Sequence, residues 1–146
     1  MKHLEARVLV PPASITDAQA VRQKVFQEEQ GIAKDIDFDG QDESAIHVVI
    51  YDTRNPVGTG RIRYLDDNQT AKIERVAVLS ELRGLGIGRL IMRHIDSHLA
   101  TTGASKAVLD AQLHAKGFYE SLGYKQEGEI FEEVGIPHVK MVKNFK

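Results

Sequence analysis

The sequence contains no cysteine, and this absence limits the chemistry that the chain can perform. Disulfides, thiolate-bound metals and a cysteine nucleophile are all excluded. Any group transfer must therefore proceed without a cysteine-bound intermediate. The absence also agrees with a cytoplasmic location, which we expect for this chain.

Long hydrophobic segments are also missing. No apolar run approaches the roughly 20 residues that a membrane-spanning helix requires, and the opening segment MKHLEARVLVPP lacks the layout of a signal peptide. The net charge of −2 gives no positive field that would attract nucleic acid or an anionic membrane. With 146 residues, 42% of them hydrophobic, the chain is expected to form one domain over 1–146 with its own core.

The spacing of apolar residues predicts both strands and helices. We expect a right-handed parallel crossover within 71–111, antiparallel hairpins before and after it, and hence an α/β fold whose mixed sheet has helices on both faces. The helix after the glycine-rich turn should bury a stripe of Ile87, Ile91, Ile95 and Leu99. The expected strands are 4–10, 45–52, 57–65, 71–79 and 106–111. The expected helices are 17–30, the segment that follows the glycine-rich turn and ends near Ala100, and 113–122. A closing hairpin of 124–133 and 138–145 is expected to turn around Gly135.

Three glycines at alternate positions, Gly84, Gly86 and Gly88, precede the second predicted helix. A bare backbone at the start of a helix attracts anions. Two phosphate-binding motifs do not fit, because Arg89 and Leu90 stand where a Walker loop ends in Lys and Ser or Thr, and Arg89 stands where a dinucleotide fingerprint has its third glycine. A glycine-rich helix start without a ligand stays open as an alternative.

The residues around these glycines resemble the acetyl-CoA-binding motif of the GNAT superfamily of N-acetyltransferases. Segment 83–88, RGLGIG, matches the pattern [RQ]-x-x-G-x-[GA]. Segment 111–124, AQLHAKGFYESLGY, resembles the family's N-x-x-A-x-x-x-Y-x-x-x-G-[FY], with Gln112 in the usual Asn position. The segments RQKVFQEEQG, DIDFDGQD and FEEVGIPHVKM are similar to the bacterial YjcF/ElaA-like branch, so the resemblance covers nearly the whole chain.

This resemblance implies a fold and a co-substrate. A GNAT fold has a mostly antiparallel central sheet in which one parallel strand pair, here 71–79 and 106–111, splays to hold acetyl-CoA. Backbone groups of strand 71–79 would stabilise charge on the thioester oxygen, and the amides of the glycine loop, aided by the helix dipole, would suit the pyrophosphate. The implied acetyl-CoA contacts are Val76, Ala77, Val78, Arg83, Gly84, Leu85, Gly86, Ile87, Gly88, Arg89, Gln112, Ala115 and Tyr119.

Acetylation of an amine also needs an acid and a base. Tyr119 matches the family position whose phenol protonates the departing thiolate, while a packed core tyrosine is the alternative reading. A primary amine has a pKa near 10 and arrives charged at neutral pH. Glu74, two residues before Val76, is expected on the same strand face as that residue, although it could instead be an ion-paired carboxylate. The base candidates are Glu29, His138 and Glu74, followed by Glu28, His47 and His114.

Other features leave several readings open. Segment 35–43, DIDFDGQDE, carries five carboxylates that could attract a cationic acceptor or form a solvated loop. The scattered histidines match no catalytic zinc pattern, so we expect no metal. The leading hypothesis is transfer of an acetyl group from acetyl-CoA to a primary amine by direct attack in a ternary complex. A non-catalytic acetyl-CoA sensor or scaffold and a nucleotide-binding domain are the alternatives, and strand edges could pair subunits into a homodimer.

Overall fold

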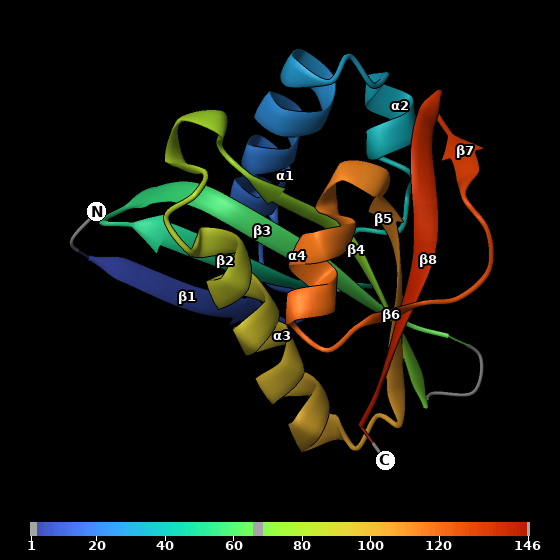
Figure 1. The fold of residues 1–146 in the computed structure, drawn as a ribbon. Coiled ribbons are helices and arrows are strands. Elements are labelled where there is room, and N and C mark those ends of the chain that lie inside the picture. The colour runs from blue at the N-terminus through green and yellow to red at the C-terminus, as the bar shows by residue number, and fades with distance from the viewer. Residues whose placement is uncertain (1–2, 66–68, 146) are drawn as a thin grey trace.

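The structure of the protein is a computed structural model that describes residues 3–65 and 69–145. Its strands are β1 (Leu4–Leu9), β2 (Ile46–Asp52), β3 (Asn55–Tyr64), β4 (Thr70–Val78), β5 (Lys106–Gln112), β6 (Lys125–Gln126), β7 (Phe131–Glu133) and β8 (Ile136–Asn144). They form one sheet in the order β1-β2-β3-β4-β5-β8-β6, with β7 paired to β8 (Figure 1). Within the described residues β4 and β5 are parallel and the other neighbours are antiparallel.

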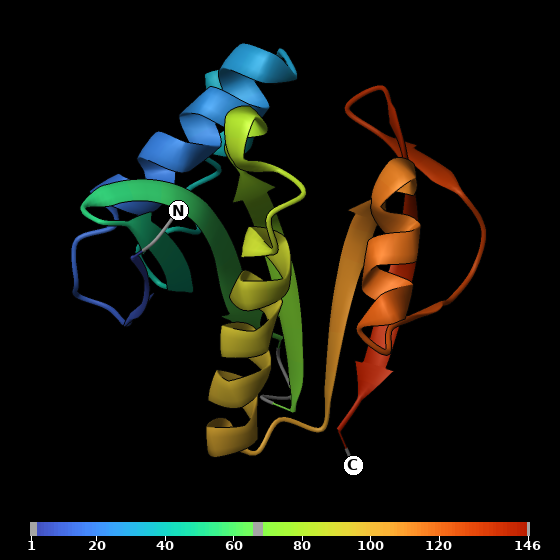
Figure 2. The same ribbon diagram turned by 60° about the vertical axis from the view of Figure 1, so that its left-hand side comes forward.

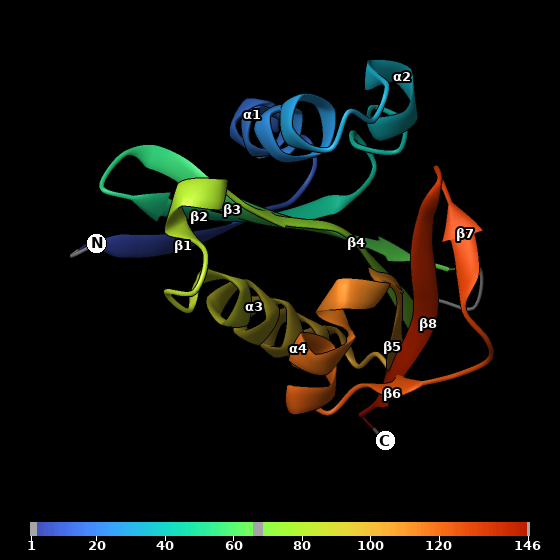
Figure 3. The same cartoon turned by 45° about the horizontal axis from the view of Figure 1, so that its top comes forward.

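Helices cover both faces of this sheet (Figure 3). Helix α1 (Thr16–Arg22), its π-helical continuation η1 (Gln23–Glu29) and α2 (Lys34–Asp37) lie on one face, while α3 (Ile87–Thr102) and α4 (Lys116–Ser121) lie on the other. The short 3-10 turns η2 (Ser80–Leu82) and η3 (Leu113–Ala115) lead toward α3 and α4. The mixed fold with helices on both faces is therefore confirmed, whereas the second half of the predicted helix 17–30 winds as a π-helix.

Helix α3 packs directly on the sheet. The predicted apolar stripe is confirmed, because each of its members is at most 1% exposed. Two glycines of β3 permit the close approach. A Cβ atom on Gly58 would lie 2.8 Å from Ile87 Cγ2, and one on Gly60 would lie 3.0 Å from Ile91 Cγ2. Side chains at these strand positions would push α3 away from the sheet.

Strand β4 carries a bulge opposite β3. Between two pairings β3 advances two residues, from 59 to 61, while β4 spans three, from 77 to 74. Arg75 at the bulge has a φ of 55°. Glu74 bonds Arg61 on the α1 side, whereas Val76 lies on the α3 side, 3.6 Å from where a Cβ of Gly60 would be. The prediction that Glu74 and Val76 share a face is therefore wrong, because the extra residue breaks the strand alternation.

Strands β4 and β5 pair only over their first residues. The last pair that joins them is Ile73 and Leu109, and beyond it the two strands diverge, as the green and orange arrows of Figure 2 show. The splayed parallel pair expected from the family resemblance is thus confirmed. None of the helices in the described ranges is long and apolar enough to cross a membrane, and the cytoplasmic location itself stays a prediction.

The chain closes on a hairpin of β7 and β8. Its turn at Val134 and Gly135 lies where the sequence predicted it. The preceding segment 124–133 is not one continuous strand, because β6 and β7 are short pieces that pair with different parts of β8.

Candidate active site

A cavity of about 790 Å³ opens where β4 and β5 diverge. Its walls come from η1, α2, the bulged end of β4, the glycine loop, the end of β5, α4 and the β7–β8 hairpin. The structure brings Tyr119, Glu29, His138 and Glu74 to this cavity. It also brings there all the predicted acetyl-CoA contacts except Leu85, whose side chain is 55% exposed to solvent.

The bulge of β4 supplies backbone to the cavity. Val76, Ala77 and Val78 all line it. An extra residue in one strand is left without a cross-strand partner, so amide groups near Val76 are not all used by the ladder with β3. Arg75 ties the bulge to α2. Its guanidinium donates to the carbonyl oxygens of Ile36 at 3.2 Å and Asp37 at 3.5 Å. Sequence patterns gave no sign of this role for Arg75, because a positive φ in a strand is invisible to them.

The glycine loop is open to the cavity. Gly84 and Gly86 have φ values of 80° and 87°, which side chains rarely adopt, and no atom lies within 4 Å of where a Cβ would stand on either. Among the described residues, no side chain caps the N-terminus of α3. The first-turn amides of a helix have no partner inside it, so they remain available to an anion. Arg89 lies beside them and donates to Ser121 Oγ at 3.1 Å.

Arg83 and Glu29, which both line the cavity, form an ion pair. Two guanidinium nitrogens of Arg83 donate to the two carboxylate oxygens of Glu29, each at 2.6 Å. The Arg83 Nε also donates to the carbonyl oxygen of Val78 at 3.1 Å. This hydrogen bonding keeps the pKa of Glu29 below its ordinary value. Two residues predicted for different roles are therefore bound to each other.

Tyr119 lies in α4 with its ring in the core. Its ring meets those of Phe118 and Tyr124 edge to face, at centroid distances of 5.0 and 5.9 Å. Burial raises the pKa of its phenol, so the hydroxyl stays protonated near neutral pH. Within the described part of the chain no group bonds that hydroxyl, and the residue lines the cavity. Tyr119 can therefore serve as a proton donor there.

His138 faces the cavity from β8. Its Nδ1 lies 2.7 Å from the carbonyl oxygen of Ile136, and a carbonyl can only accept. Nδ1 therefore carries a proton, and Nε2 is the ring nitrogen that could accept one. That nitrogen lies 3.6 Å from a carboxylate oxygen of Glu133, and the ring of Phe131 stacks on the imidazole at 5.9 Å. The arrangement suits a base whose protonated form is stabilised by a neighbouring carboxylate.

Glu74 is held by three cations. Arg61 and Arg63 donate to its carboxylate at 2.9 and 2.5 Å, and Lys72 lies 3.8 Å away. Burial acts to raise its pKa, but the bond from Arg63 and the charges of Arg61 and Lys72 prevail and lower it. Glu74 is therefore an ion-paired carboxylate of β4.

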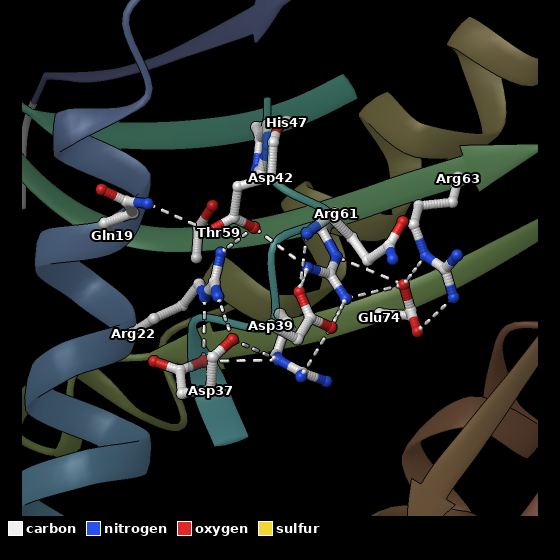
Figure 4. Close-up of polar contacts among 12 residues, drawn as sticks. Gln19, Arg22, Asp37, Asp39, Asp42, His47, Thr59, Arg61, Arg63 and Glu74 are labelled. Atoms are coloured by element: carbon white, nitrogen blue, oxygen red, sulfur yellow. Dashed lines mark hydrogen bonds and ion pairs between the residues drawn. The ribbon is translucent and has the colours of Figure 1, made fainter. Parts of the chain in front are cut away.

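Three carboxylates of the acidic segment bind arginine side chains (Figure 4). Asp37 and Asp42 bind the fully buried Arg22 at 3.1 and 2.6 Å. Asp39 and Asp42 bind the fully buried Arg61 at 2.8 and 3.0 Å. Three of the five carboxylates are thus counter-ions for buried arginines, whereas Asp35 and Glu43 are exposed, as in a solvated loop. Attraction of a cationic acceptor stays a prediction. The alternation of charges in the sequence could not reveal where the arginines point.

A pair of amides bridges the cavity near the end of β5. Gln30 and Gln112 exchange two hydrogen bonds of 3.2 and 3.0 Å between the end of η1 and β5. His114 lies 2.8 Å from the Gln112 amide oxygen. Gln30 was not predicted, and no motif in the sequence marks it.

Two base candidates lie away from the cavity. Glu28 is not among its lining residues. His47 is fully buried, and its Nε2 donates to the carbonyl oxygen of Asp42 at 2.9 Å. Nowhere in residues 3–65 and 69–145 does a group of three metal-ligating side chains occur.

Solved structures share this architecture. Escherichia coli ElaA superimposes with a TM-score of 0.85 and 29% identity, over 97% of this chain and 100% of that one. A GNAT family acetyltransferase from Elizabethkingia anophelis, solved with acetyl-CoA bound, superimposes with a TM-score of 0.75 over 99% and 100% of the two chains. At 14% identity this second match shows a common fold.

Sequence comparison identifies the family. The uncharacterized N-acetyltransferase YjcF of Bacillus subtilis (strain 168) is 38% identical over 131 residues, which are 89% of this chain and 92% of that protein. Residues 12–145 match the Acetyltransferase (GNAT) domain. The resemblance seen in the glycine loop and in the segment around Tyr119 therefore extends to nearly the whole chain, and the protein belongs to the GNAT acetyltransferase family, in its YjcF/ElaA-like branch.

Proposed function

We propose that this protein transfers the acetyl group of acetyl-CoA to a primary amine within one ternary complex. The observation that carries the proposal is that one cavity reaches the glycine loop, the bulged backbone of β4, Tyr119 and His138. Family membership and the acetyl-CoA held by the E. anophelis fold neighbour support the choice of donor. The absence of cysteine favours direct attack by the amine over a cysteine-bound intermediate.

The glycine loop fits the pyrophosphate of coenzyme A. The open space above Gly84 and Gly86 and the uncapped start of α3 provide room and donors for an anion. Arg83 and Arg89 border the same space. Arg83 is already bound to Glu29, so we expect the pyrophosphate to draw its guanidinium away from that carboxylate.

Acetyl-CoA supplies an activated thioester, and the chain's own groups manage the charges and protons. As the amine nitrogen bonds the carbonyl carbon and the carbon–sulfur bond breaks, amides near Val76 stabilise charge on the thioester oxygen. His138 Nε2 accepts the proton that the ammonium must lose before attack. Tyr119 donates its proton to the leaving sulfur and recovers it from the amine nitrogen through solvent. The products are an acetamide and coenzyme A.

The two carboxylate candidates at the cavity have environments that favour their ionised form. Glu29 is bound by Arg83 and Glu74 by Arg61 and Arg63, and these contacts lower their pKa values. A carboxylate stabilised in its charged form is a weaker proton acceptor. We therefore assign the base to His138 ahead of Glu29, and Glu29 ahead of Glu74.

The proposal is tested by binding and turnover together. We expect release of thiol to depend on an added amine and mass spectrometry to find the acetylated amine. Gly86→Glu places a carboxylate against the pyrophosphate and should abolish acetyl-CoA binding in calorimetry. Gly128→Glu is the matched control, because Gly128 has the same φ of 87° and the same open surroundings but does not line the cavity.

Two results would decide against this function. Unchanged acetyl-CoA binding by Gly86→Glu removes the pyrophosphate assignment. Tight acetyl-CoA binding without turnover of any amine favours a sensor or scaffold instead.

A further inference from the structure

Exposed apolar side chains border the cavity at α2 and at the β7–β8 turn. Ile36 in α2 and Val134 in the β7–β8 turn each retain 46% of their exposure, and both line the cavity. Figure 2 shows the N-terminal helices and the β7–β8 hairpin on opposite sides of the opening between β4 and β5. Single exposed apolar residues are common on proteins, but two that face one cavity from separate elements make an apolar mouth.

Val134 adopts a backbone conformation that valine disfavours. Its φ is 48° and that of Gly135 is 75°. Two-residue hairpin turns with positive φ at both positions favour Asn-Gly or Asp-Gly. A β-branched residue with positive φ is a true outlier, and such strain is found where function retains it. Turn formation alone does not explain the valine at this position.

The charges near this mouth are mostly neutralised. Asp37 is bound by Arg22 and by Arg75, at 3.1 and 3.3 Å. Glu74 is bound by arginines, and Lys72 lies 3.7 Å from Asp110. The carboxylates of Asp37, Glu74 and Asp110 are therefore not available to bind a polycation.

One acidic group is placed differently. The Glu133 side chain is 56% exposed and has as its partner the imidazole of His138. It precedes Val134 in the chain and lines the same cavity. A single carboxylate beside a single base suits one ammonium group.

We propose that the acceptor is a primary monoamine with an alkyl or aryl body, which lies between Ile36 and Val134 while its ammonium group meets Glu133 and His138. This inference rests on the acetyl transfer proposed above. It disfavours polyamines and amino sugars, whose additional polar groups would enter an apolar mouth without partners.

Hexylamine and 1,6-diaminohexane provide a matched pair of probes. They have the same chain length, but the second carries an additional ammonium group at the end that would lie in the apolar mouth. We expect kcat/KM for acetylation to be at least about tenfold higher for hexylamine, because a pocket discriminates by this much even for a single methylene group. Glucosamine and spermidine should be poorer still.

Val134→Asn separates a contact with substrate from a structural role. Asparagine suits the turn, so the melting temperature should rise, while KM for hexylamine should increase about tenfold because apolar contact is lost. Acetyl-CoA affinity should stay unchanged. Ile36→Ser should raise the same KM, and Ile130→Asn is the control because Ile130 is 56% exposed but does not line the cavity.

The inference is overturned if diaminohexane or spermidine is the better substrate, or if Val134→Asn leaves KM for hexylamine unchanged. Either result leaves acetyl transfer itself intact. Failure to acetylate any amine while acetyl-CoA binds would overturn the proposed function and this inference with it.

Discussion

The two walls of the cavity are built in different ways. On the helix side, Arg22 and Arg61 are fully buried and bind carboxylates of the segment that contains α2. On the hairpin side, His138 Nε2 lies 3.6 Å from a carboxylate oxygen of Glu133, and both residues line the cavity. Carboxylates of one wall are committed to structure, and the carboxylate of the other is available to a substrate.

The two walls are therefore expected to have different roles: the helix wall positions parts of the site, and the hairpin wall carries the groups proposed to act on the substrate. The helix wall fixes α2 and, through Arg75, the bulge of β4. Arg75 holds the bulge through its guanidinium, which leaves the amides of the bulge available to the substrate. The hairpin wall carries the proposed base and the strained Val134. We expect changes in the first wall to affect stability and changes around the second to affect turnover.

Loss of a buried arginine should have the largest effect. Arg22→Gln leaves Asp37 and Asp42 buried without their main counter-ion, so the free energy of unfolding should fall by about 3–5 kcal/mol. Chemical denaturation measures this change. Arg7→Gln removes an exposed pair with Glu5 and should leave the denaturation midpoint where it is. Equal midpoints for the two variants would mean that the buried cluster does not hold the helix wall.

Tyr119→Phe should lower kcat by about 10²–10⁴-fold with acetyl-CoA affinity unchanged, because one acid group is lost and ring packing is kept. Steady-state kinetics and calorimetry test the two parts. Tyr124→Phe is the matched control. Tyr124 has a buried hydroxyl with no partner among the described residues and does not line the cavity, so its kcat should not change. A normal kcat for Tyr119→Phe would identify Tyr119 as a packed core residue.

His138→Gln should lower kcat most at acidic pH, by about 10²-fold, and less at alkaline pH, where more of the amine is already neutral. Glu29→Gln provides the comparison, since Glu29 is paired with Arg83 and should show a smaller loss. The pH–rate profiles of both variants give the answer. If Glu29→Gln alone changes the profile, the order of the two bases is reversed.

The smallest effect concerns His47 on the helix wall. Burial lowers its pKa, with a further contribution from Arg22 and Arg61, although its contacts with Asp42 oppose the shift. Its Nδ1 is buried and lacks a partner within the described ranges. The unfolded chain therefore takes up a proton that the folded one resists, and stability should decline as pH falls below about 6.5.

The slope from this one group is at most about 1.4 kcal/mol per pH unit. His47→Gln should flatten the dependence of the unfolding free energy between pH 5 and 7, about the range in which histidine titrates. An unchanged slope would assign that pH dependence to another group.

Local patterns predicted most of the fold and most of the residues that line the cavity beside the glycine loop, whose binding of acetyl-CoA stays a proposal. The glycines of the loop and the apolar stripe of α3 act through backbone conformation and helical period, which can be read along the chain. The face of Glu74 could not be predicted, because one extra residue in β4 breaks the period of two. The partners of Asp37, Asp39 and Asp42 depend on where distant arginines lie, and so does the pairing of Arg83 with Glu29. The assignment of one domain to 1–146 stays a prediction.

If both walls act on one reaction, the acetyl group passes directly from acetyl-CoA to the amine. A single turnover with isotopically labelled acetyl-CoA and hexylamine, stopped at successive times, follows free thiol, acetylated amine and protein mass together. Direct transfer requires that thiol and labelled acetamide appear at the same rate and that the protein mass never increases. Acetylated protein that forms before the acetamide, or thiol released without any acetamide, would contradict it.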